Sequence, residues 1–369
     1  MVGLLSTSLL PSGVAAQPAN LIWHQPAPLP LEIWARWDSE WYLLIAEHGY
    51  DVGDRLSALG VSYERSAAAG FLPLYPIVIR MLTPIFGAVA AGIVVSNVCL
   101  FLSLVVLDRL VRLEIGGETG AFAGIAAGAA LLLHPSSLFL SAVYAESLFL
   151  VLSLGAFLGA RSGRFWIAGI CGGLATLTRP FGILLVLPLF WEWWMWRRSA
   201  GDTRSRRTRG WSGVWLVTMP IALSGFFLFS SMTFGDPLAL LHRQERWRGG
   251  LSGPWRAFVR WWEAGPTAHG THGSTLELII AVACLVMLVF MVRRLRPSYA
   301  LYTAAAIILA LGSTLWSFSR LTLTLFPLFV LIGLSWSEGR RCLPTLYAFV
   351  SAALGGLLMA LFANWWWAG

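Results

Sequence analysis

Residues 88–110 of this chain read AVAAGIVVSNVCLFLSLVVLDRL and predict a helix that crosses a membrane. A crossing takes about 20 mostly apolar residues in α-helical conformation. Comparable stretches lie elsewhere in the chain, one before it at residues 71–86 and the others after it at 119–134, 137–160, 165–179, 180–196, 212–232, 275–292, 298–315, 321–336 and 343–364. Hydrophobic residues make up 57% of the chain and charged residues 12%, against about 25% charged residues in a soluble domain. The sequence therefore predicts a single all-α integral membrane domain over residues 1–369, a polytopic protein with about 10 transmembrane segments.

The apolar stretch at 71–86 differs from the others because it contains Pro73 and Pro76. Proline interrupts helical hydrogen bonding, and irregular backbone persists at membrane depth only where protein or a wet cavity surrounds it. We therefore expect residues 71–86 to form a half-helix or re-entrant segment.

The arginines predict which loops face the cytoplasm. The net charge is +8, and the chain contains no lysine. Cytoplasmic loops of membrane proteins carry an excess of basic residues. Short basic loops of this kind occupy residues 109–112, 161–164, 197–209, 293–296 and 340–341. The number of spans between them is consistent with placing all five on one side.

The opposite, non-cytoplasmic side then receives the remaining loops. These are the turns at 134–135 and 179–180, the long loop 233–274, and residues 317–320. The first loop, 31–70, joins them if residues 71–86 are re-entrant. We expect Trp365, Trp366 and Trp367 to form an aromatic belt at this surface. The positive charge is thus a topology signal, and membrane lipids rather than nucleic acids are the expected partners.

The first residues and the cysteines give weaker signals. Met1–Ala19 is mildly apolar and is interrupted by Pro11 and Pro18. We expect a poorly packed remnant of a first span or a late start there, in preference to a secretory signal with small residues at Gly13–Ala16, because no basic segment precedes them. The scattered spacing predicts free thiols rather than a metal site at Cys99, Cys171, Cys284 and Cys342.

A charged and aromatic segment at residues 34–50 is the strongest candidate for a functional site. Steps of three and four, the spacing of one helical face, separate Trp34, Trp37, Trp41 and Ile45. We expect an amphipathic helix in the membrane interface, with these aromatic residues toward lipid. Charged residues in such an apolar chain are costly unless they lie at the surface or take part in chemistry. Asp38 is therefore either a functional carboxylate or a solvated charge that caps a helix.

Three further charged residues lie near the same predicted surface. Glu146 follows Tyr144 within an apolar stretch, where an ionised carboxylate needs a partner. It belongs either to a functional site or to a structural ion pair with an arginine. Arg179 and Arg320 could each bind a phosphate in bidentate fashion, or could extend to the membrane surface as interfacial arginines.

The long loop combines basic and aromatic residues. Residues 242–248 read HRQERWR, and Trp255, Arg260, Trp261 and Trp262 follow. Aromatic rings stack on sugars and arginines hold lipid phosphates, whereas the alternative is an interfacial helix on anionic lipid. We expect His269 and His272, in a glycine-rich segment, to lie in a flexible loop rather than a metal site.

Several short motifs occur in a fixed order. Residues 37–50 read WDSEWYLLIAEHGY and 71–76 read FLPLYP; HPSS at 134–137, YAES at 144–147 and GLATLTR at 173–179 follow. GDPL at 235–238 leads to Gln244 and Trp247, and Ser319-Arg320 leads to Phe326-Pro327. This series covers most of residues 34–330. It resembles the PIG-V mannosyltransferases, the family of the GPI mannosyltransferase that adds the second mannose and of its bacterial relatives.

The resemblance implies a GT-C-type glycosyltransferase fold with a non-cytoplasmic first loop that carries the catalytic motif. It implies transfer of mannose, a hexose, from a polyprenyl-phosphate donor on the non-cytoplasmic face. The acidic residue of the first outer loop is the expected base, and its matching position is Asp38. Expected substrate-binding residues are Arg36, Glu40, His48, Tyr144, Glu146, Arg179, Gln244 and Arg320, with His48 closer to a support residue than to a catalyst. Such enzymes begin with a full span before the motif, which Met1–Ala19 does not convincingly provide.

The chemistry fits these residues. A sugar hydroxyl is a poor nucleophile, so a carboxylate must take its proton as attack begins. One base and one direct displacement would invert the anomeric configuration. We expect neither a metal nor a further cofactor, because the donor is lipid-linked and the chain has no Asp-x-Asp motif for a nucleotide sugar.

Composition narrows the acceptor and the cellular setting that the resemblance implies. Arginine without lysine, with abundant alanine and glycine, suggests a GC-rich bacterial genome. We therefore expect a multi-pass protein of the bacterial plasma membrane, with a glycolipid or envelope glycan as acceptor. Two other classes remain: a transporter or lipid flippase, which predicts internal repeats, and a scaffold subunit, in which Asp38 would be dispensable.

Overall fold

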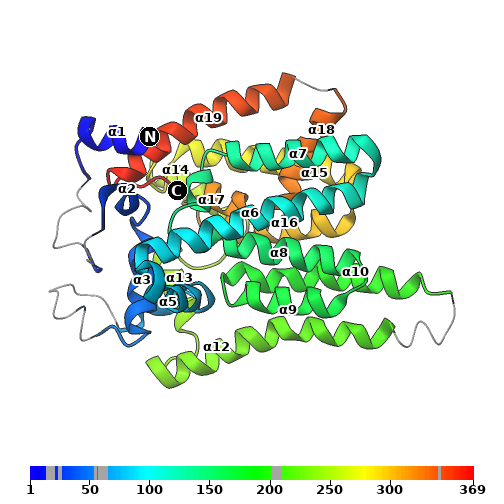
Figure 1. The fold of residues 1–369 in the computed structure, drawn as a ribbon, viewed down its shortest axis with the longest axis horizontal. Helices are drawn as coiled ribbons and strands as arrows, with labels where there is room; N and C mark the ends of the chain where they lie inside the picture. The colour runs from blue at the N-terminus through cyan, green and yellow to red at the C-terminus, as the bar shows by residue number, and fades with distance from the viewer. Residues whose placement is uncertain (14–20, 24–26, 54–55, 57–64, 202–208, 340–341) are drawn as a thin grey trace.

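The computed structural model describes residues 1–13, 21–23, 27–53, 56, 65–201, 209–339 and 342–369. In these ranges the chain is helical, with a single isolated bridge between Thr267 and Ser274 in place of a sheet. Figure 1 shows long helices running side by side along one axis. We call the end that carries α1 and the chain's C-terminus the termini end, and the opposite end the arginine end.

The long helices run between the two ends, and several short helices lie at the termini end. Their bounds are α1 Val2–Leu9, α2 Leu29–Glu32, α3 Asp38–His48, η3 Arg65–Gly70, α5 Leu74–Phe86, α6 Ala88–Ile115, α7 Gly117–Leu133, η4 Ser137–Leu140, α8 Glu146–Arg161, α9 Phe165–Thr176, η5 Pro180–Leu185, α10 Val186–Arg198, η6 Ser212–Val217, α12 Thr218–Phe234, α13 Ala239–Arg248, α14 Arg256–Glu263, α15 Thr275–Arg294, α16 Pro297–Leu311, α17 Phe318–Leu323, α18 Phe326–Ser337 and α19 Cys342–Ala363. The all-α prediction is confirmed.

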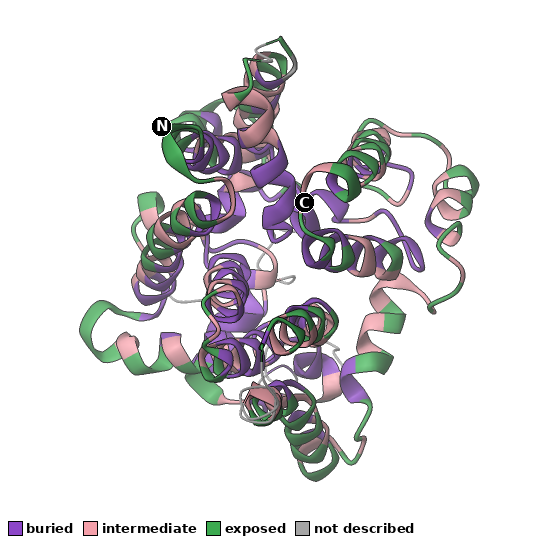
Figure 2. Ribbon diagram, turned by 90° about the vertical axis from the view of Figure 1, so that its right-hand side faces the viewer, coloured by how far each residue is buried: buried purple, intermediate pink, exposed green. Residues whose placement is uncertain are grey.

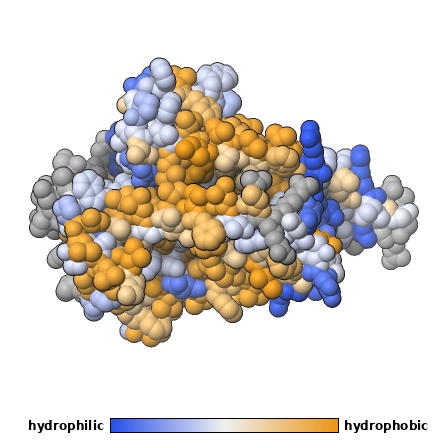
Figure 3. Space-filling model, turned by 90° about the horizontal axis from the view of Figure 1, so that it is seen from above, coloured by the Kyte–Doolittle hydropathy of each residue, from blue (hydrophilic) through white to orange (hydrophobic). Residues whose placement is uncertain are grey.

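The surface of the bundle is that of a membrane protein. Within the described ranges, four helices are long and apolar enough to cross a bilayer: Ala88–Ile115, Arg209–Phe234, Thr275–Arg294 and Pro344–Ala363. Large apolar side chains point away from the protein on several helices, among them Phe101, Ile125, Met232 and Phe349. Figure 2 shows buried residues facing inward and exposed ones outward, and Figure 3 shows a hydrophobic middle with hydrophilic residues toward both ends, the most strongly hydrophilic at one of them. Such an exposed apolar band has lipid as its natural solvent.

The described parts of the predicted basic loops lie at the arginine end, as the span count requires, whereas residues 202–208 and 340–341 lie outside the described residues. Arg161 at the end of α8 pairs with Glu114 near the end of α6, and Arg296 before α16 reaches Glu114 at 2.7 Å. Glu192 of α10 lies 3.4 Å from Arg161. These contacts bring the ends of four helices to one place, as the predicted grouping requires of the loops 109–112, 161–164 and 293–296.

Residues 71–86 form a half-helix. Pro73 precedes α5, and Gly87, with φ 77°, reverses the chain into α6. At about 1.5 Å per residue, a 13-residue helix is too short for a full crossing. Figure 1 places α5 beside α3 at the termini end. The described parts of the loop 31–70 therefore lie at that end, opposite the described basic residues.

Three expectations are corrected here. Residues 137–160 are not one helix, because η4 and a turn precede α8, and Glu146 is the first residue of α8. His272 is not in a free loop, since its ring lies edge-on to Trp316 at 4.4 Å and its Nδ1 is 3.1 Å from the hydroxyl of Thr314. Residues 2–9 form α1, which packs on α19. Most of the pattern Gly13–Ala16 lies outside the described residues.

Candidate active site

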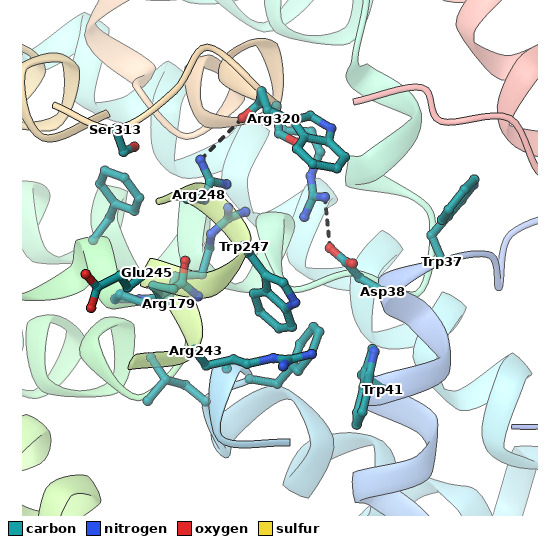
Figure 4. A pocket seen from close by; sticks show the side chains of 18 of the residues that line it. Trp37, Asp38, Trp41, Arg179, Arg243, Glu245, Trp247, Arg248, Ser313 and Arg320 are labelled. Atoms are coloured by element: carbon teal, nitrogen blue, oxygen red, sulfur yellow. Dashed lines mark hydrogen bonds and ion pairs between the residues drawn. The ribbon is translucent and has the colours of Figure 1, made fainter. Parts of the chain in front are cut away.

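A cavity of about 1110 Å³ opens at the termini end. Its wall comes from segments far apart in sequence: α3, residues 70–72, residues 178–181, α13, the end of α16, α17 and the last residues of the chain. The lining carries the carboxylates of Asp38, Glu40 and Glu245 and the guanidinium groups of Arg179, Arg243, Arg248 and Arg320. Figure 4 shows Asp38 and several of these arginines facing one another across the cavity.

Helix α3 presents Asp38 at its first position. Trp37, which precedes it, has φ 59° and ψ −119°, a backbone conformation that bulky residues rarely adopt. The positive end of the helix dipole favours a carboxylate at this place. The backbone turn at Trp37 thus aims the Asp38 side chain into the cavity rather than along the protein surface.

Most of α3 beyond Asp38 is buried, with only Glu47 and His48 exposed at its end, so the prediction of an interfacial helix is wrong. Residues 39–46 are all buried, including Trp41 and Ile45 of the expected lipid-facing stripe. Trp41 stacks on Phe71 at 5.6 Å, and Tyr42 packs edge-on to Tyr75 at 5.1 Å. The aromatic residues that gave the helical pattern face protein and cavity, because α5 and α6 cover the helix.

Arg320 joins the two acidic candidates. Its Nη1 donates to Asp38 Oδ2 at 2.9 Å, and its Nε and Nη2 donate to Glu146 Oε1 at 3.1 and 2.9 Å. Its guanidinium carbon lies 4.8 Å from the ring centres of Phe139 and Tyr144. Charge-assisted bonds of this kind are roughly twice as strong as neutral ones, so Arg320 fixes the position of Asp38.

Glu146 also contacts Arg179. The Arg179 Nη1 atom makes an ion pair with Glu146 Oε1, and the Glu146 side chain is fully buried. A buried carboxylate is stable only when opposite charges and hydrogen bonds compensate it, and two arginines do so here. Arg179 is mostly buried, so it is not an interfacial arginine, and Glu146 is the shared support of two cavity-lining cations.

Arg248, the last residue of α13, brings a third arginine to the same place. Its Nη1 donates to the Trp316 carbonyl at 3.3 Å, and its own carbonyl accepts from Arg260. Desolvation, together with the nearby charges of Arg320 and Arg179, lowers the pKa of Arg248 to about 10. It remains a cation at neutral pH, in a place that favours the arrival of an anion.

Aromatic side chains form much of the remaining wall. Trp247 packs edge-on to Phe71 at 5.5 Å, and Arg243 lies over the Trp247 ring at 4.5 Å. On the other side, Trp37 packs against Trp365 and Trp367 at 6.3 and 5.2 Å. Two of the three tryptophans expected in a surface belt therefore line the cavity, and of the three only Trp366 is exposed.

Some of the residues that line the cavity lie in a region similar to known proteins. The family described as “Mannosyltransferase (PIG-V)” matches residues 27–193, the region that supplies Asp38, Glu146 and Arg179. Residues 27–193 are thus similar to the PIG-V mannosyltransferases. Curated relatives include GPI alpha-1,6-mannosyltransferase 2 of Cricetulus griseus, 31% identical over 164 residues, and of Homo sapiens, 29% identical over 161 residues. Each match covers 41% of this chain and spans only 30% of the relative's length.

The fold has a wider likeness. The crystal structure of ArnT from Cupriavidus metallidurans bound to undecaprenyl phosphate superposes with a TM-score of 0.51 at 15% identity. The alignment covers 98% of this chain and 74% of the ArnT chain. The fold of this chain is therefore similar to that of ArnT along nearly its whole length.

The sequence-predicted residues divide into three groups. The cavity is lined by Asp38, Glu40, Arg179, Gln244 and Arg320. Tyr144 and Glu146 lie directly behind it, and the Tyr144 hydroxyl donates to the Arg36 carbonyl at 3.0 Å. Arg36 and His48 are outside the lining. Arg36 pairs with Glu32 at 2.6 Å, and His48 lies 3.5 Å from Glu47 at the exposed end of α3.

Sequence reasoning underrated α13. The basic segment 242–248 had an interfacial helix as its alternative, but Gln244, Trp247 and Arg248 line the cavity. Gly249, with φ 73°, ends the helix immediately after Arg248. Gly249 was the signal in the sequence: a glycine that ends the helix directly after Arg248 holds this arginine at a fixed position.

Proposed function

We propose that this protein is a membrane-embedded mannosyltransferase that moves a mannose from a polyprenyl-phosphate donor to a lipid-linked or envelope glycan acceptor. The observation that carries the proposal is the meeting of Asp38 with Arg179, Arg248 and Arg320 around one cavity. The PIG-V similarity of residues 27–193 supports the reaction class.

Asp38 is the general base in this scheme. The acceptor hydroxyl gives its proton to the Asp38 carboxylate while its oxygen forms a bond to the anomeric carbon. The bond from that carbon to the phosphate oxygen breaks, and polyprenyl phosphate leaves. A single displacement inverts the anomeric configuration. The hydrogen bond from Arg320 keeps Asp38 oriented while leaving its second oxygen, Oδ1, for the acceptor.

The arginines stabilise the departing phosphate. Arg320 and Arg179 share Glu146, so part of their charge is already compensated. Among these three arginines, Arg248 donates a single hydrogen bond, to a carbonyl, and has no ion pair with an acidic residue in the described part of the chain. It is the group best able to bind a phosphate as negative charge develops. Phosphate-bearing polyprenyl is also what the ArnT crystal structure contains.

The remaining features belong to the same proposal. Residues 1–369 act as one membrane domain, with the loops 31–70 and 233–274 carrying the site on the non-cytoplasmic face. The setting is a bacterial plasma membrane with the cavity toward the outside. The scheme uses no metal or other cofactor, because four arginines line the cavity and can balance the phosphate charge.

The test is transfer by the purified protein in lipid. Radiolabelled polyprenyl-phosphate mannose is supplied with a panel of lipid-linked acceptors, and products are separated by chromatography. Asp38→Asn is expected to lower kcat at least about 100-fold, the usual scale of a lost general base. Arg248→Gln is expected to lose a comparable factor in kcat/KM for the donor.

Arg256→Gln is the matched control. Arg256 is an arginine of the same loop and pairs with Glu263 at 3.5 Å, away from the cavity lining. Its transfer rate should equal that of the wild type. Undiminished transfer by Asp38→Asn would contradict the base assignment. Movement of substrate across the membrane without transfer by the wild type would favour a flippase.

A further inference from the structure

A buried carboxylate outside the cavity holds the helix that carries Arg320. Glu277 lies in the first turn of α15. Its Oε2 accepts a hydrogen bond from the backbone N–H of Ser319 at 2.6 Å, and its Oε1 accepts from the Ser319 hydroxyl at 2.8 Å. Glu277 and Ser319 are 1% and 0% exposed. The residue that follows Ser319 is Arg320.

Helix α17 depends on such contacts for its position. It comprises only the six residues Phe318–Leu323, and a helix this short has little stability of its own. Its first N–H groups have no partner within the helix. Ser317, the residue before it, has φ 63° and offers no side-chain cap. Glu277, which belongs to the neighbouring helix α15, caps the start of α17 instead.

A buried carboxylate is a costly choice for capping α17. Burying an ionised carboxyl is expensive unless a cation or several hydrogen bonds compensate it. In the described part of the chain, no arginine or histidine pairs directly with Glu277, although Arg248 and Arg320 are near enough to attract it electrostatically. Its two hydrogen bonds both go to the residue adjacent to Arg320.

We propose that Glu277 is a positioning residue for the transfer reaction, fixing the start of α17 so that Arg320 reaches Glu146 and Asp38 together. The inference rests on the proposed function. Arg320 uses three nitrogens on two carboxylates from different helices, an arrangement that tolerates little displacement. A shift of about 1 Å in a site can cost about 100-fold in rate.

The experiment compares Glu277→Ala with a matched variant, Glu192→Ala. Glu192 is also a buried carboxylate that accepts from a serine hydroxyl, that of Ser298 at 2.5 Å, but it lies at the arginine end. Both variants should lose thermal stability. We expect Glu277→Ala to lower kcat for mannose transfer about 10- to 100-fold, while Glu192→Ala keeps the wild-type kcat per folded molecule.

Glu277→Gln separates position from charge. The amide can still accept from the Ser319 N–H and bond to its hydroxyl, so kcat should return to within about threefold of the wild type. If Glu277→Ala does not fold, Ser319→Ala removes one of the two hydrogen bonds, and kcat should fall several-fold. Equal kcat values for Glu277→Ala and Glu192→Ala, or an unchanged kcat in Ser319→Ala, would overturn the inference.

Hydrogen exchange provides a readout that does not depend on transfer. The Ser319 amide is protected by Glu277, so peptides covering residues 318–323 should exchange faster in Glu277→Ala than in Glu192→Ala or the wild type. Faster exchange with an unchanged kcat overturns the positioning role alone. Absence of transfer by the wild type overturns the proposed function and this inference with it.

Discussion

At the residue scale, the site depends on a few charged side chains that each pair with more than one side chain of opposite charge. Arg320 bonds to Asp38 and Glu146, and Glu146 also pairs with Arg179. Removing one partner of such a buried set leaves an uncompensated charge. The set therefore holds Asp38 in one orientation, and it leaves Arg248 as the cation that can respond to a phosphate.

Glu40 gives a prediction at the same scale. Burial raises the pKa of Glu40 to about 8, against a usual value near 4.5, although the Ile22 N–H and Arg36 partly oppose this. Between pH 4.5 and about pH 8, the Glu40 carboxyl therefore keeps its proton in the folded protein but has lost it in the unfolded chain. Its stability contribution is present below about pH 4.5 and is lost as pH rises to about 8.

We therefore expect the thermal unfolding midpoint of the wild type to fall as pH rises from 5 to 8, measured in detergent by fluorescence. Glu40→Gln keeps an uncharged side chain of the same shape, so this part of the pH dependence should disappear. An identical pH profile for the two proteins would show that Glu40 titrates normally.

At the scale of elements, the sequence predicts where helices form better than it predicts whether their faces contact lipid or protein. The half-helix at 71–86 was predictable because Pro73 and Pro76 are local signals. The surroundings of α3 were not, because a stripe such as Trp37, Trp41 and Ile45 has the same spacing whether it faces lipid or protein. The partnership of Glu146 with Arg179 and Arg320 needed the tertiary fold, because 174 residues separate Glu146 from Arg320.

The close packing of α18 against α7 gives a further prediction. An added Cβ at Gly333 of α18 would lie 2.3 Å from the Ala123 carbonyl oxygen of α7. Gly333→Ala must therefore separate α7 and α18, and overpacking of this kind costs about 1–3 kcal/mol. We expect a lower unfolding midpoint. Gly225→Ala is the control: nothing lies within 4 Å of its added Cβ, so its midpoint should stay equal or rise.

At the scale of the whole molecule, the two ends differ in what their charges do. At the arginine end, Glu114 and Glu192 are tied to Arg161 and Arg296 in pairs that link four helices. At the termini end, charged residues face a cavity instead. Because the arginine end carries the described residues of the basic loops, the positive-inside rule predicts that the arginine end faces the cytoplasm.

That orientation can be measured on intact cells. Gly201 lies exposed at the arginine end, after α10, and Glu263 lies exposed in the long loop at the termini end. We substitute each by cysteine in a background whose four native cysteines are serine or alanine, since Cys342 is itself exposed. A membrane-impermeant maleimide should label Glu263→Cys on intact cells, and Gly201→Cys only after permeabilisation. The reverse pattern would place the cavity in the cytoplasm, and a donor that presents its sugar outside could then not reach Asp38.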